Sequence, residues 1–469
     1  MRQRGMKMLH IRQKQAVQLF LVQLVLIALN SGVFALVWYL YFADRLDKPF
    51  YAKGDYAVIL LFVVIYALLA RLYGGFALTI SRITELIYSQ GVALLISYGL
   101  MYIVAVLLMR VWANPVPLLL AWAVSCFFAF LWARPANNAT NRICPPARTI
   151  LVYLNEEAHK NGKAIIRSLS WRFELEQEIC ASTPTQEICE TIRESGVDTV
   201  MLCGIASSQR NDILKFCIMN DIRCMVRPNI GDFVMNSAPI LQMDNLPVMM
   251  CQRATPSVVY AAGKRLADLL LGLVGLVIAS PFMLVAALAI KVYDGGPVLF
   301  RQTRLTKDGR EFEILKFRSM RVDAEKDGVA RLAAKADDRI TPVGKVIRAC
   351  RIDELPQIIN ILRGDMSLVG PRPERPEIAA QYEEHIPEFA LRLQVKAGLT
   401  GYAQVYGKYN TAPYDKLQMD LMYIAQQGFV TDLKIIFATI KILFVPESTE
   451  GVDQGQTTAI SESEQTGVQ

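Results

Sequence analysis

Long apolar runs alternate with charged segments along the first third of the chain. Each of the first four runs is long enough to cross a bilayer as a helix, which takes about 17–25 residues. The runs are Ala16 to Phe42, Tyr56 to Tyr73, Val92 to Met109 and Pro115 to Ala133. Lysine and arginine precede the first run and follow the fourth, a pattern typical of membrane helices whose flanks face the cytoplasm. We therefore predict four transmembrane helices within residues 1–145, with both ends of this region in the cytoplasm.

In residues 146–255 the pattern changes to short strand-like runs that alternate with helix-like stretches. The strand-like runs include TILVYL, DTVMLCGI and DIRCMVRP. This order predicts a Rossmann-like α/β domain with a largely parallel sheet. Asn155, Glu156 and Glu157 follow the first strand, where a glycine-rich dinucleotide loop would be needed. A packing or regulatory role is therefore favoured over cofactor binding.

A fifth apolar run, Leu269 to Ile290, has basic residues on both sides and a Ser280-Pro281 pair near its middle. Proline has no amide hydrogen and its ring displaces the carbonyl of Val277, so the helix must bend there. The Ser280 hydroxyl can satisfy a freed backbone group inside lipid. Because both flanks are basic, we predict a re-entrant hairpin that enters and leaves on the cytoplasmic side. The alternative is an ordinary fifth span, which would place everything after Ile290 outside the cell.

Residues 256–446 are predicted to form an α+β domain on the cytoplasmic face, built around this re-entrant helix. Its first polar stretch predicts a β-hairpin that turns at Asp308-Gly309 and ends in a basic pair, Lys316 and Arg318.

The C-terminal end of the chain contains two further segments, a short apolar run and an acidic tail. A short apolar run, Leu433 to Val445, is interrupted by Lys441 and predicts an interfacial helix. Residues 447–469 carry acidic side chains among Ser, Thr, Gly and Gln, which predicts a disordered tail.

Composition supports a membrane protein with a basic body. Hydrophobic residues make up 53% of the 469 residues, and the formal net charge is +7. A basic body suits an anionic bilayer or a polyanionic substrate, whereas no motif indicates nucleic-acid binding. The nine cysteines have no CxxC spacing, which predicts free thiols and argues against a disulfide framework or a zinc site.

The stretch RIDELPQIINILRGDMSLVGPRP, from Arg351 to Pro373, contains the candidate chemistry. Leu355, Ile358, Ile359 and Leu362 have helical spacing, so we predict an amphipathic helix. Asp353 then lies at or near the N-cap and Glu354 in the first turn, where free amides favour ionised carboxylates. Neighbouring helical side chains diverge by about 100°, so this geometry permits one nucleophile and one metal ligand.

Acidic residues at a helix start are usually caps, so the basic neighbours decide the interpretation. Arg351 precedes the acidic pair, and Arg372 lies between Pro371 and Pro373. Because proline fixes φ, this arginine is presented on a stiff loop suited to bidentate phosphate binding. For each arginine taken alone, a surface salt bridge remains the simpler interpretation, but the whole set of charges favours a functional one.

The motifs KFRSM, DDRITPVGKVIR, DELPQIINILRGDMSLVGPRPERPE and GLTGYAQV together resemble the bacterial polyprenyl-phosphate sugar-1-phosphate transferases, also called monotopic phosphoglycosyl transferases. The likeness covers about Val258 to Val445. The four preceding spans and the α/β domain resemble the long-form members that initiate exopolysaccharide, capsule or O-antigen synthesis. The family's Ser-Pro break falls on Ser280 and Pro281, and Tyr402 stands where the family usually has tryptophan.

The resemblance implies transfer of a sugar 1-phosphate from a UDP-sugar to undecaprenyl phosphate, with release of UMP, at the cytoplasmic face of the inner membrane. It makes Asp353 the nucleophile of a covalent intermediate, with Glu354 helping to hold Mg²⁺. The candidate phosphate contacts are Lys316, Arg318, Arg351 and Arg372, with Thr400 and Gln404 as weaker candidates for positioning the donor.

The expected partners are the donor, the lipid acceptor and membrane lipids, and a homodimer is left open. By analogy, glucose or galactose is favoured as the sugar. The alternatives are an N-acetylhexosamine donor and a non-catalytic scaffold for polysaccharide assembly, although the intact acidic pair and basic set argue against a scaffold.

Overall fold

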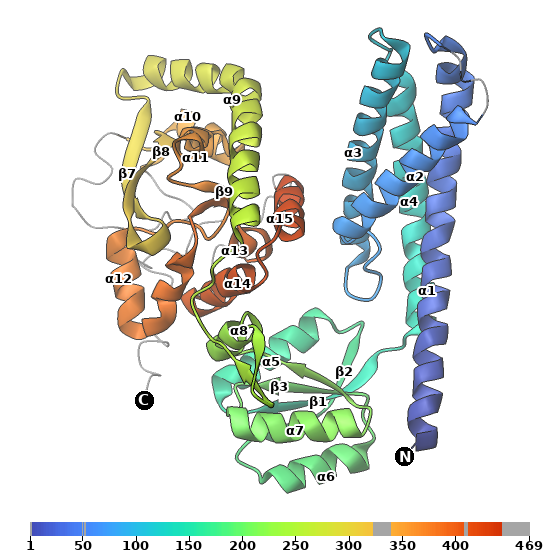
Figure 1. Cartoon of the computed structure of the whole chain (residues 1–469), viewed down its shortest axis with the longest axis vertical. Helices are drawn as coiled ribbons and strands as arrows, with labels where there is room; N and C mark the ends of the chain where they lie inside the picture. The colour runs from blue at the N-terminus through green and yellow to red at the C-terminus, as the bar shows by residue number, and fades with distance from the viewer. Residues whose placement is uncertain (1, 49, 51–52, 322–338, 408–410, 443–469) are drawn as a thin grey trace. The chain divides into compact units, whose positions relative to one another are not determined.

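The computed structural model describes residues 2–48, 50, 53–321, 339–407 and 411–442 (Figure 1). Its contacts divide the chain into two compact units, Met1–Arg227 and Pro228–Gln469. The division falls earlier than the domain boundary expected at residue 255. The predicted acidic tail, residues 447–469, lies outside the described residues.

The first unit begins with four long helices, each of which extends beyond its predicted apolar run at one end. They are α1 (Arg2–Val37), α2 (Gly54–Leu72), α3 (Ile83–Met109) and α4 (Val116–Ile143). Together with α9 of the second unit, the described residues contain five helices long and apolar enough to cross a membrane. Many of their large apolar side chains are exposed, which suits a lipid environment.

Buried polar side chains join the first three helices to one another. The Asn30 amide donates to the Tyr66 hydroxyl, which donates in turn to Gln90, each over 2.8 Å. The Gln90 amide reaches the carbonyl of Gly75 at 2.8 Å. Because partners for polar groups are scarce in lipid, this chain of hydrogen bonds favours one packing of the helices over others.

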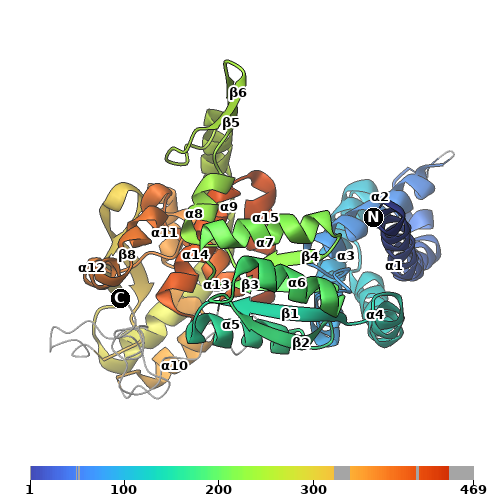
Figure 2. The same cartoon turned by 90° about the horizontal axis from the view of Figure 1, so that it is seen from below.

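The rest of the first unit is the predicted α/β sheet, with all four strands parallel in the order β2-β1-β3-β4 (Figure 2). Its strands and helices are β1 (Ala147–Tyr153), α5 (Glu156–Ser168), β2 (Phe173–Cys180), α6 (Thr185–Ser195), β3 (Thr199–Cys203), α7 (Ser207–Met219) and β4 (Arg223–Val226). One hydrophobic cluster joins the sheet to α6 and α7, and another joins it to α5. Asn155 caps α5 by accepting from the Ala158 amide at 2.8 Å. All nine cysteines are free, as predicted.

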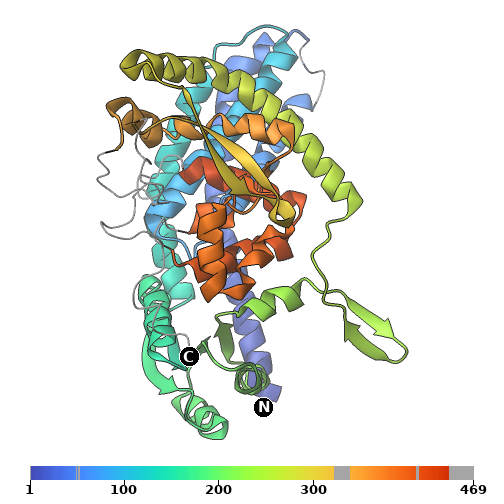
Figure 3. The same ribbon diagram turned by 90° about the vertical axis from the view of Figure 1, so that its left-hand side faces the viewer.

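The second unit is organised around α9 (Val258–Asp294), a 37-residue helix with Pro281 in its interior. The helix bends sharply (Figures 1 and 3). The Ser280 hydroxyl donates to the Val277 carbonyl over 2.8 Å, the carbonyl that a proline at position 281 deprives of its helical partner. The bend and the serine contact are as predicted from the sequence.

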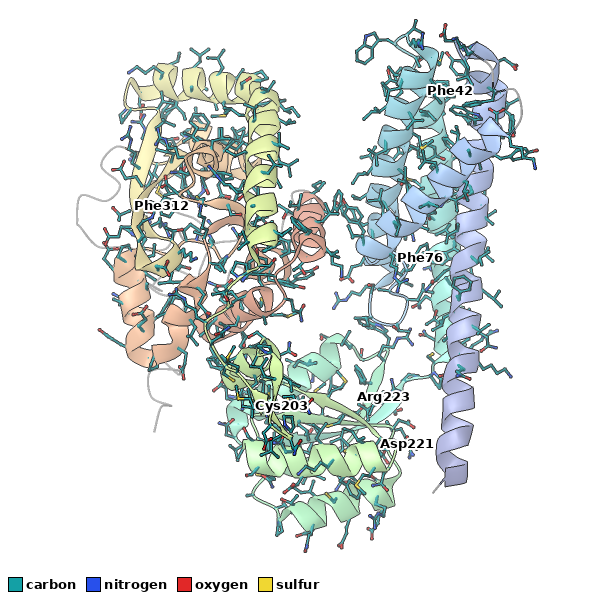
Figure 4. The ribbon with its side chains drawn as sticks, in the orientation of Figure 1. Phe42, Phe76, Cys203, Asp221, Arg223 and Phe312 are labelled. Carbon is teal, nitrogen blue, oxygen red and sulfur yellow. The ribbon has the colours of Figure 1, made fainter. Side chains whose placement is uncertain are left out.

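The rest of the second unit includes several elements that pack on α9. Its elements are α8 (Ile230–Asn236), β5 (Ile240–Met243), β6 (Leu246–Met249), β7 (Leu299–Leu305), β8 (Glu311–Phe317), α10 (Pro342–Ala349), a 3₁₀ turn (Ile352–Glu354), α11 (Gln357–Arg363), β9 (Ser367–Val369), α12 (Pro376–His385), a 3₁₀ segment (Pro387–Gln394), β10 (Gly398–Thr400), α13 (Tyr402–Tyr406), α14 (Pro413–Ala425) and α15 (Phe429–Ile442). Strands β7 and β8 form the predicted hairpin, which turns through Asp308 and Gly309 with φ of 63° and 72°. Phe312 of β8 is buried in the core of this unit (Figure 4).

Both halves of α9 contact the segment that carries the acidic pair. In the first half, a Cβ on Gly272 would lie 3.2 Å from the Leu362 side chain, so the small residue permits close packing on α11. In the second half, Ala286 and Ile290 belong to a cluster with Ile347 and Ile352. The acidic pair is therefore fixed between two stretches of the same bent helix.

The helix predicted from Leu433 to Val445 corresponds to α15, which begins four residues earlier, at Phe429. Asp432 in its first turn is buried and bonds to Lys264, Tyr260 and Tyr423. This polar anchor extends the helix beyond the apolar run.

Candidate active site

The acidic pair lies on a separate turn and not at the start of the following helix. Asp353 and Glu354 end a 3₁₀ turn that begins at Ile352, whereas α11 begins at Gln357 with Pro356 as its N-cap. The sequence-based placement of Asp353 at the helix N-cap is therefore wrong. The turn follows Arg351, which has a left-handed backbone conformation with φ of 53°. Such a conformation is costly for a residue other than glycine and is often found at functional sites.

The helix after the turn is buried on more sides than an amphipathic pattern allows. Asn360 and Ile361 are both 0% exposed, although neither belongs to the predicted apolar face. The Asn360 amide donates to the Glu313 carbonyl at 2.8 Å, and its oxygen accepts from the Leu315 amide at 3.0 Å. These bonds to β8 fix α11 beside the hairpin, and periodicity could not predict them because they depend on a distant strand.

Glu354 is the electrostatic centre of the site. Its Oε1 atom accepts from Lys316 Nζ and from an Arg372 guanidinium nitrogen, both at 3.0 Å. The Glu354 side chain is only 17% exposed. Burial alone would raise its pKa, but Lys316 and Arg372 hold the pKa of Glu354 well below its usual range. Burial also lowers the pKa of Lys316, against the opposing effect of Glu354.

Asp353 is in a different electrostatic situation. Within the part of the chain that the structure describes, its side chain forms no hydrogen bond or ion pair. Burial raises the pKa of Asp353, the neighbouring Glu354 adds to that effect, and Lys316, Arg348 and Arg372 oppose it. The expectation that a helix end lowers this pKa is therefore wrong. Arg348, in the last turn of α10, is a nearby cation that the sequence interpretation missed.

Arg372 and Lys316 also line a small pocket beside Glu354. Arg304 and Gln357 line it too, and neither was a predicted site residue. Arg304 donates to the Pro373 carbonyl at 3.0 Å and so helps to fix the loop that carries Arg372. The pocket is strongly basic, and a mobile polyanion is the kind of ligand that such a lining favours.

Three predicted site residues are engaged elsewhere. Arg318 forms a buried ion pair with Asp294 at the end of α9, not with Glu354. The Thr400 hydroxyl lies 2.6 Å from that of Thr439, and the Gln404 amide donates to the Leu399 carbonyl at 3.0 Å. The structure therefore brings Lys316, Arg372 and Glu354 together next to Asp353, and uses Arg318, Thr400 and Gln404 within the fold.

The residues present fit Mg²⁺ only as a site completed by substrate. Among the described residues there is no group of three or more His, Cys, Asp or Glu side chains that could hold a metal. Glu354 uses one carboxylate oxygen for its two cations, which leaves Oε2 as an available hard oxygen ligand. Mg²⁺ in phosphate-transferring sites is commonly bound by one or two carboxylates, substrate phosphates and water. The donor set is compatible with that arrangement.

Among the described residues, the arrangement combines a carboxylate that has no ion-pair partner with a basic pocket lined by Arg304, Lys316 and Arg372. A carboxylate without hydrogen-bond donors retains its lone pairs for attack on an electrophile. Cations fixed beside it can stabilise negative charge that develops on a phosphoryl group. The chemistry that fits is phosphoryl transfer.

Comparison with known proteins points the same way. A family model described as bacterial sugar transferase matches residues 259–446. The chain is 42% identical over 198 residues to a UDP-glucose:undecaprenyl-phosphate glucose-1-phosphate transferase from Caulobacter vibrioides, covering 41% of this chain and 74% of that protein. It is 40% identical over 199 residues to the exopolysaccharide production protein PSS from Rhizobium leguminosarum, covering 40% of this chain and 96% of the relative.

A third relative carries a different sugar in its name. It is the UDP-N-acetylgalactosamine-undecaprenyl-phosphate N-acetylgalactosaminephosphotransferase of Aeromonas hydrophila, 41% identical over 206 residues. The match covers 43% of this chain and spans about half, 48%, of that relative's length.

Proposed function

The chain belongs to the bacterial sugar transferase family of polyprenyl-phosphate sugar phosphotransferases, and from that premise we propose that it transfers a sugar 1-phosphate from a UDP-sugar to undecaprenyl phosphate. The observation that carries this proposal is the difference between the two acids. Glu354 is neutralised by Lys316 and Arg372, while Asp353 beside it has no partner among the described residues. One acid organises the cations and the other is available to react.

The first half-reaction is attack by a carboxylate oxygen of Asp353 on the phosphorus attached to the sugar. The new bond joins that oxygen to phosphorus, and the bond from phosphorus to the bridging oxygen breaks. UMP leaves with the electron pair, and an acyl phosphate remains on Asp353. Lys316 and Arg372 stabilise the negative charge on the phosphoryl oxygens, as fixed donors do in a site that excludes bulk water.

The second half-reaction returns the enzyme to its starting state. A phosphate oxygen of undecaprenyl phosphate attacks the same phosphorus, the bond from phosphorus to Asp353 breaks, and the carboxylate is regenerated. The two polyanions react in turn, so their charges need not be accommodated together. The packing of Ile352 against the second half of α9 supports access of the lipid acceptor, because the reactive turn lies next to a helix with many exposed apolar side chains.

Mg²⁺ is the proposed cofactor, with Glu354 as its protein ligand. When bound, it would neutralise charge on the diphosphate and so favour departure of UMP. The residues of this chain supply the remaining functions: Asp353 forms the bond, Lys316 and Arg372 orient the phosphates, and the bent helix α9 sets the site at the membrane.

The proposed location is the bacterial inner membrane, with α9 re-entrant and the active site on the cytoplasmic face. There the enzyme would have access to a UDP-sugar and to the phosphate of a membrane lipid. The reaction would be the first membrane step in synthesis of an exopolysaccharide, capsule or O-antigen, and the name of the Rhizobium relative supports a role in exopolysaccharide production. Glucose or galactose is the proposed sugar. Relatives named for glucose and for N-acetylgalactosamine both match this chain, so the donor has to be identified by assay.

The test is UMP release by the purified full chain in lipid nanodiscs with undecaprenyl phosphate, Mg²⁺ and one UDP-sugar at a time. UDP-glucose, UDP-galactose, UDP-N-acetylglucosamine and UDP-N-acetylgalactosamine form the panel. Lipid-dependent UMP release with UDP-glucose or UDP-galactose is the expected result. Release only with an N-acetylhexosamine donor would correct the sugar. Absence of release with every donor, from protein that is folded and inserted, would refute the proposed reaction.

A further inference from the structure

Four consecutive carbonyl groups of the loop that carries Arg372 each accept a hydrogen bond. The amide of Gly398 donates to Pro371 at 2.8 Å, and the amide of Leu305 donates to Glu374 at 3.0 Å. Guanidinium groups hold the two central carbonyls, with Arg392 donating to Arg372 at 2.8 Å and Arg304 to Pro373 at 3.0 Å. The flanking prolines alone therefore do not fix this loop.

Arg392 differs from the other donors because it is itself buried and ion-paired. The nitrogen that holds the Arg372 carbonyl lies 2.7 Å from Asp420 Oδ2. A second nitrogen lies 3.7 Å from Glu374 Oε1. The side chains of Arg392 and Asp420 are only 5% and 1% exposed. Burial raises the pKa of Asp420 to about 6, and Arg392 opposes that shift.

A buried ion pair is a poor source of net stability, because desolvation of both charges offsets their attraction. Apolar side chains of similar size could fill the same space at no greater cost. What apolar side chains could not supply is a donor for the Arg372 carbonyl. The geometry of the pair therefore fits a directional role better than a stabilising one.

We propose that Arg392 is a positioning residue, which fixes the Arg372 guanidinium over Glu354 by holding the main chain of Arg372, and that Asp420 orients Arg392 for this purpose. The proposal rests on the phosphate-binding role proposed for Arg372. It assigns a function to α14 and to the 3₁₀ segment Pro387–Gln394, neither of which supplies a residue to the pocket beside Glu354.

The test is a double-mutant cycle in the full chain in nanodiscs, with Arg392→Lys and Arg372→Ala. Lysine retains the charge, but its flexible ammonium lacks the rigid guanidinium plane in which one nitrogen faces Asp420 and the Arg372 carbonyl while a second lies 3.7 Å from Glu374. We expect Arg392→Lys to lower kcat/KM for the donor by about 10- to 100-fold, because small misplacements of a binding group are costly. In the Arg372→Ala background the same substitution should change kcat/KM by less than about twofold, because its effect passes through Arg372.

Two further variants keep the result interpretable. Asp420→Asn removes the partner charge at nearly constant volume, and we expect a smaller loss of kcat/KM that is likewise absent in the Arg372→Ala background. Arg310→Met removes a surface ion pair with Asp365 and should leave kcat/KM unchanged. Melting temperatures show whether each variant is folded. If Arg392→Lys does not fold, the Asp420→Asn cycle decides in its place.

Wild-type kcat/KM in the folded Arg392→Lys variant would overturn the positioning role. Full multiplication of the losses in the double variant would overturn it as well, because the two residues would then act independently. Failure of the proposed function is a separate outcome, since it would show as absence of UMP release by the unsubstituted chain.

Discussion

Asp353 and Glu354 are adjacent in the chain, yet the structure predicts that replacing each by its amide will affect the stability of the protein differently. Asp353→Asn should abolish the exchange of labelled UMP into UDP-sugar in the absence of lipid, because exchange requires the acyl phosphate. Loss of a nucleophile lowers rates by at least about a thousandfold. The same substitution should barely affect stability. Asp353 has no partner to lose among the described residues, and burial disfavours its ionised form, so the change should lie within about 0.5 kcal/mol of zero and towards stabilisation.

Glu354→Gln should instead destabilise the protein. It removes the negative charge shared by Lys316 and Arg372, each 3.0 Å from the same oxygen. Charged hydrogen bonds contribute about 1.5–3 kcal/mol each. The Arg372 side chain is 43% exposed, which reduces its share through solvent screening, and the amide oxygen of glutamine still accepts. A total loss of about 1–3 kcal/mol follows, which lowers the melting temperature by roughly 3–10 °C for a unit of this size.

The pH dependence of this difference has a definite sign. The folded-state pKa of Glu354 lies below its ordinary value, so its stabilising contribution is fully present above about pH 4.5 and is lost as the pH falls through the folded pKa. The melting temperatures of wild type and Glu354→Gln should therefore differ at pH 7 and converge in strong acid. Activity should fall in Glu354→Gln, together with weaker dependence on Mg²⁺.

The assay combines thermal unfolding in nanodiscs with UMP exchange and mass spectrometry of the sugar-phosphate adduct on Asp353. The reasoning fails if Asp353→Asn lowers the melting temperature by several degrees and keeps substantial turnover. Asp353 would then be a structural residue, and direct attack by the lipid phosphate would be the better mechanism. An exchange reaction that strictly requires lipid would lead to the same conclusion.

Three other predictions concern the membrane and the first unit. Pro281→Leu should straighten α9 and lower UMP exchange, because its two halves contact opposite ends of the reactive segment; unchanged exchange would show that the bend is not required. Single cysteines at Val259 and Lys307, in a cysteine-free background, should both resist an impermeant thiol reagent outside intact cells, and labelling at Lys307 alone would indicate a fifth span. A shortened chain beginning at Pro228 should retain some transfer activity in lipid, since the described acidic pair and its cations lie in the second unit, and total loss from an inserted, folded product would assign the first unit a part in catalysis.

Much of the architecture could be predicted from local signals. A turn at Asp308 and Gly309 requires positive φ, which this residue pair tolerates better than most. The break in α9 follows from the missing amide of Pro281, and the alternation of strands and helices in residues 146–226 predicts a parallel sheet. These features depend on residues that are close together in the chain.

The site was predicted only in part. The structure brings Lys316 and Arg372 together with the acidic pair, but it uses Arg318 to bind Asp294 and leaves Asp353 outside the helix. The role predicted for Arg318 differs from its observed contact because phosphate-binding and ion-pairing arginines are the same residue type. A basic residue on a strand can pair with whichever carboxylate the fold brings near, and no pattern along the strand distinguishes a phosphate contact from an ion pair with a helix end.

The sequence by itself determined where helices, strands and turns form and which acidic and basic side chains are available. Apolar periodicity and the conformational preferences of proline, glycine and turn residues act within a few residues of one another. The tertiary structure alone decided which charges meet. Glu354 binds Lys316, 38 residues away, and Arg372, 18 residues away in the other direction. Arg392 reaches the Arg372 main chain across 20 residues. Electrostatic free energies depend on separation in space and on exclusion of water, and both quantities are set only when distant segments pack together.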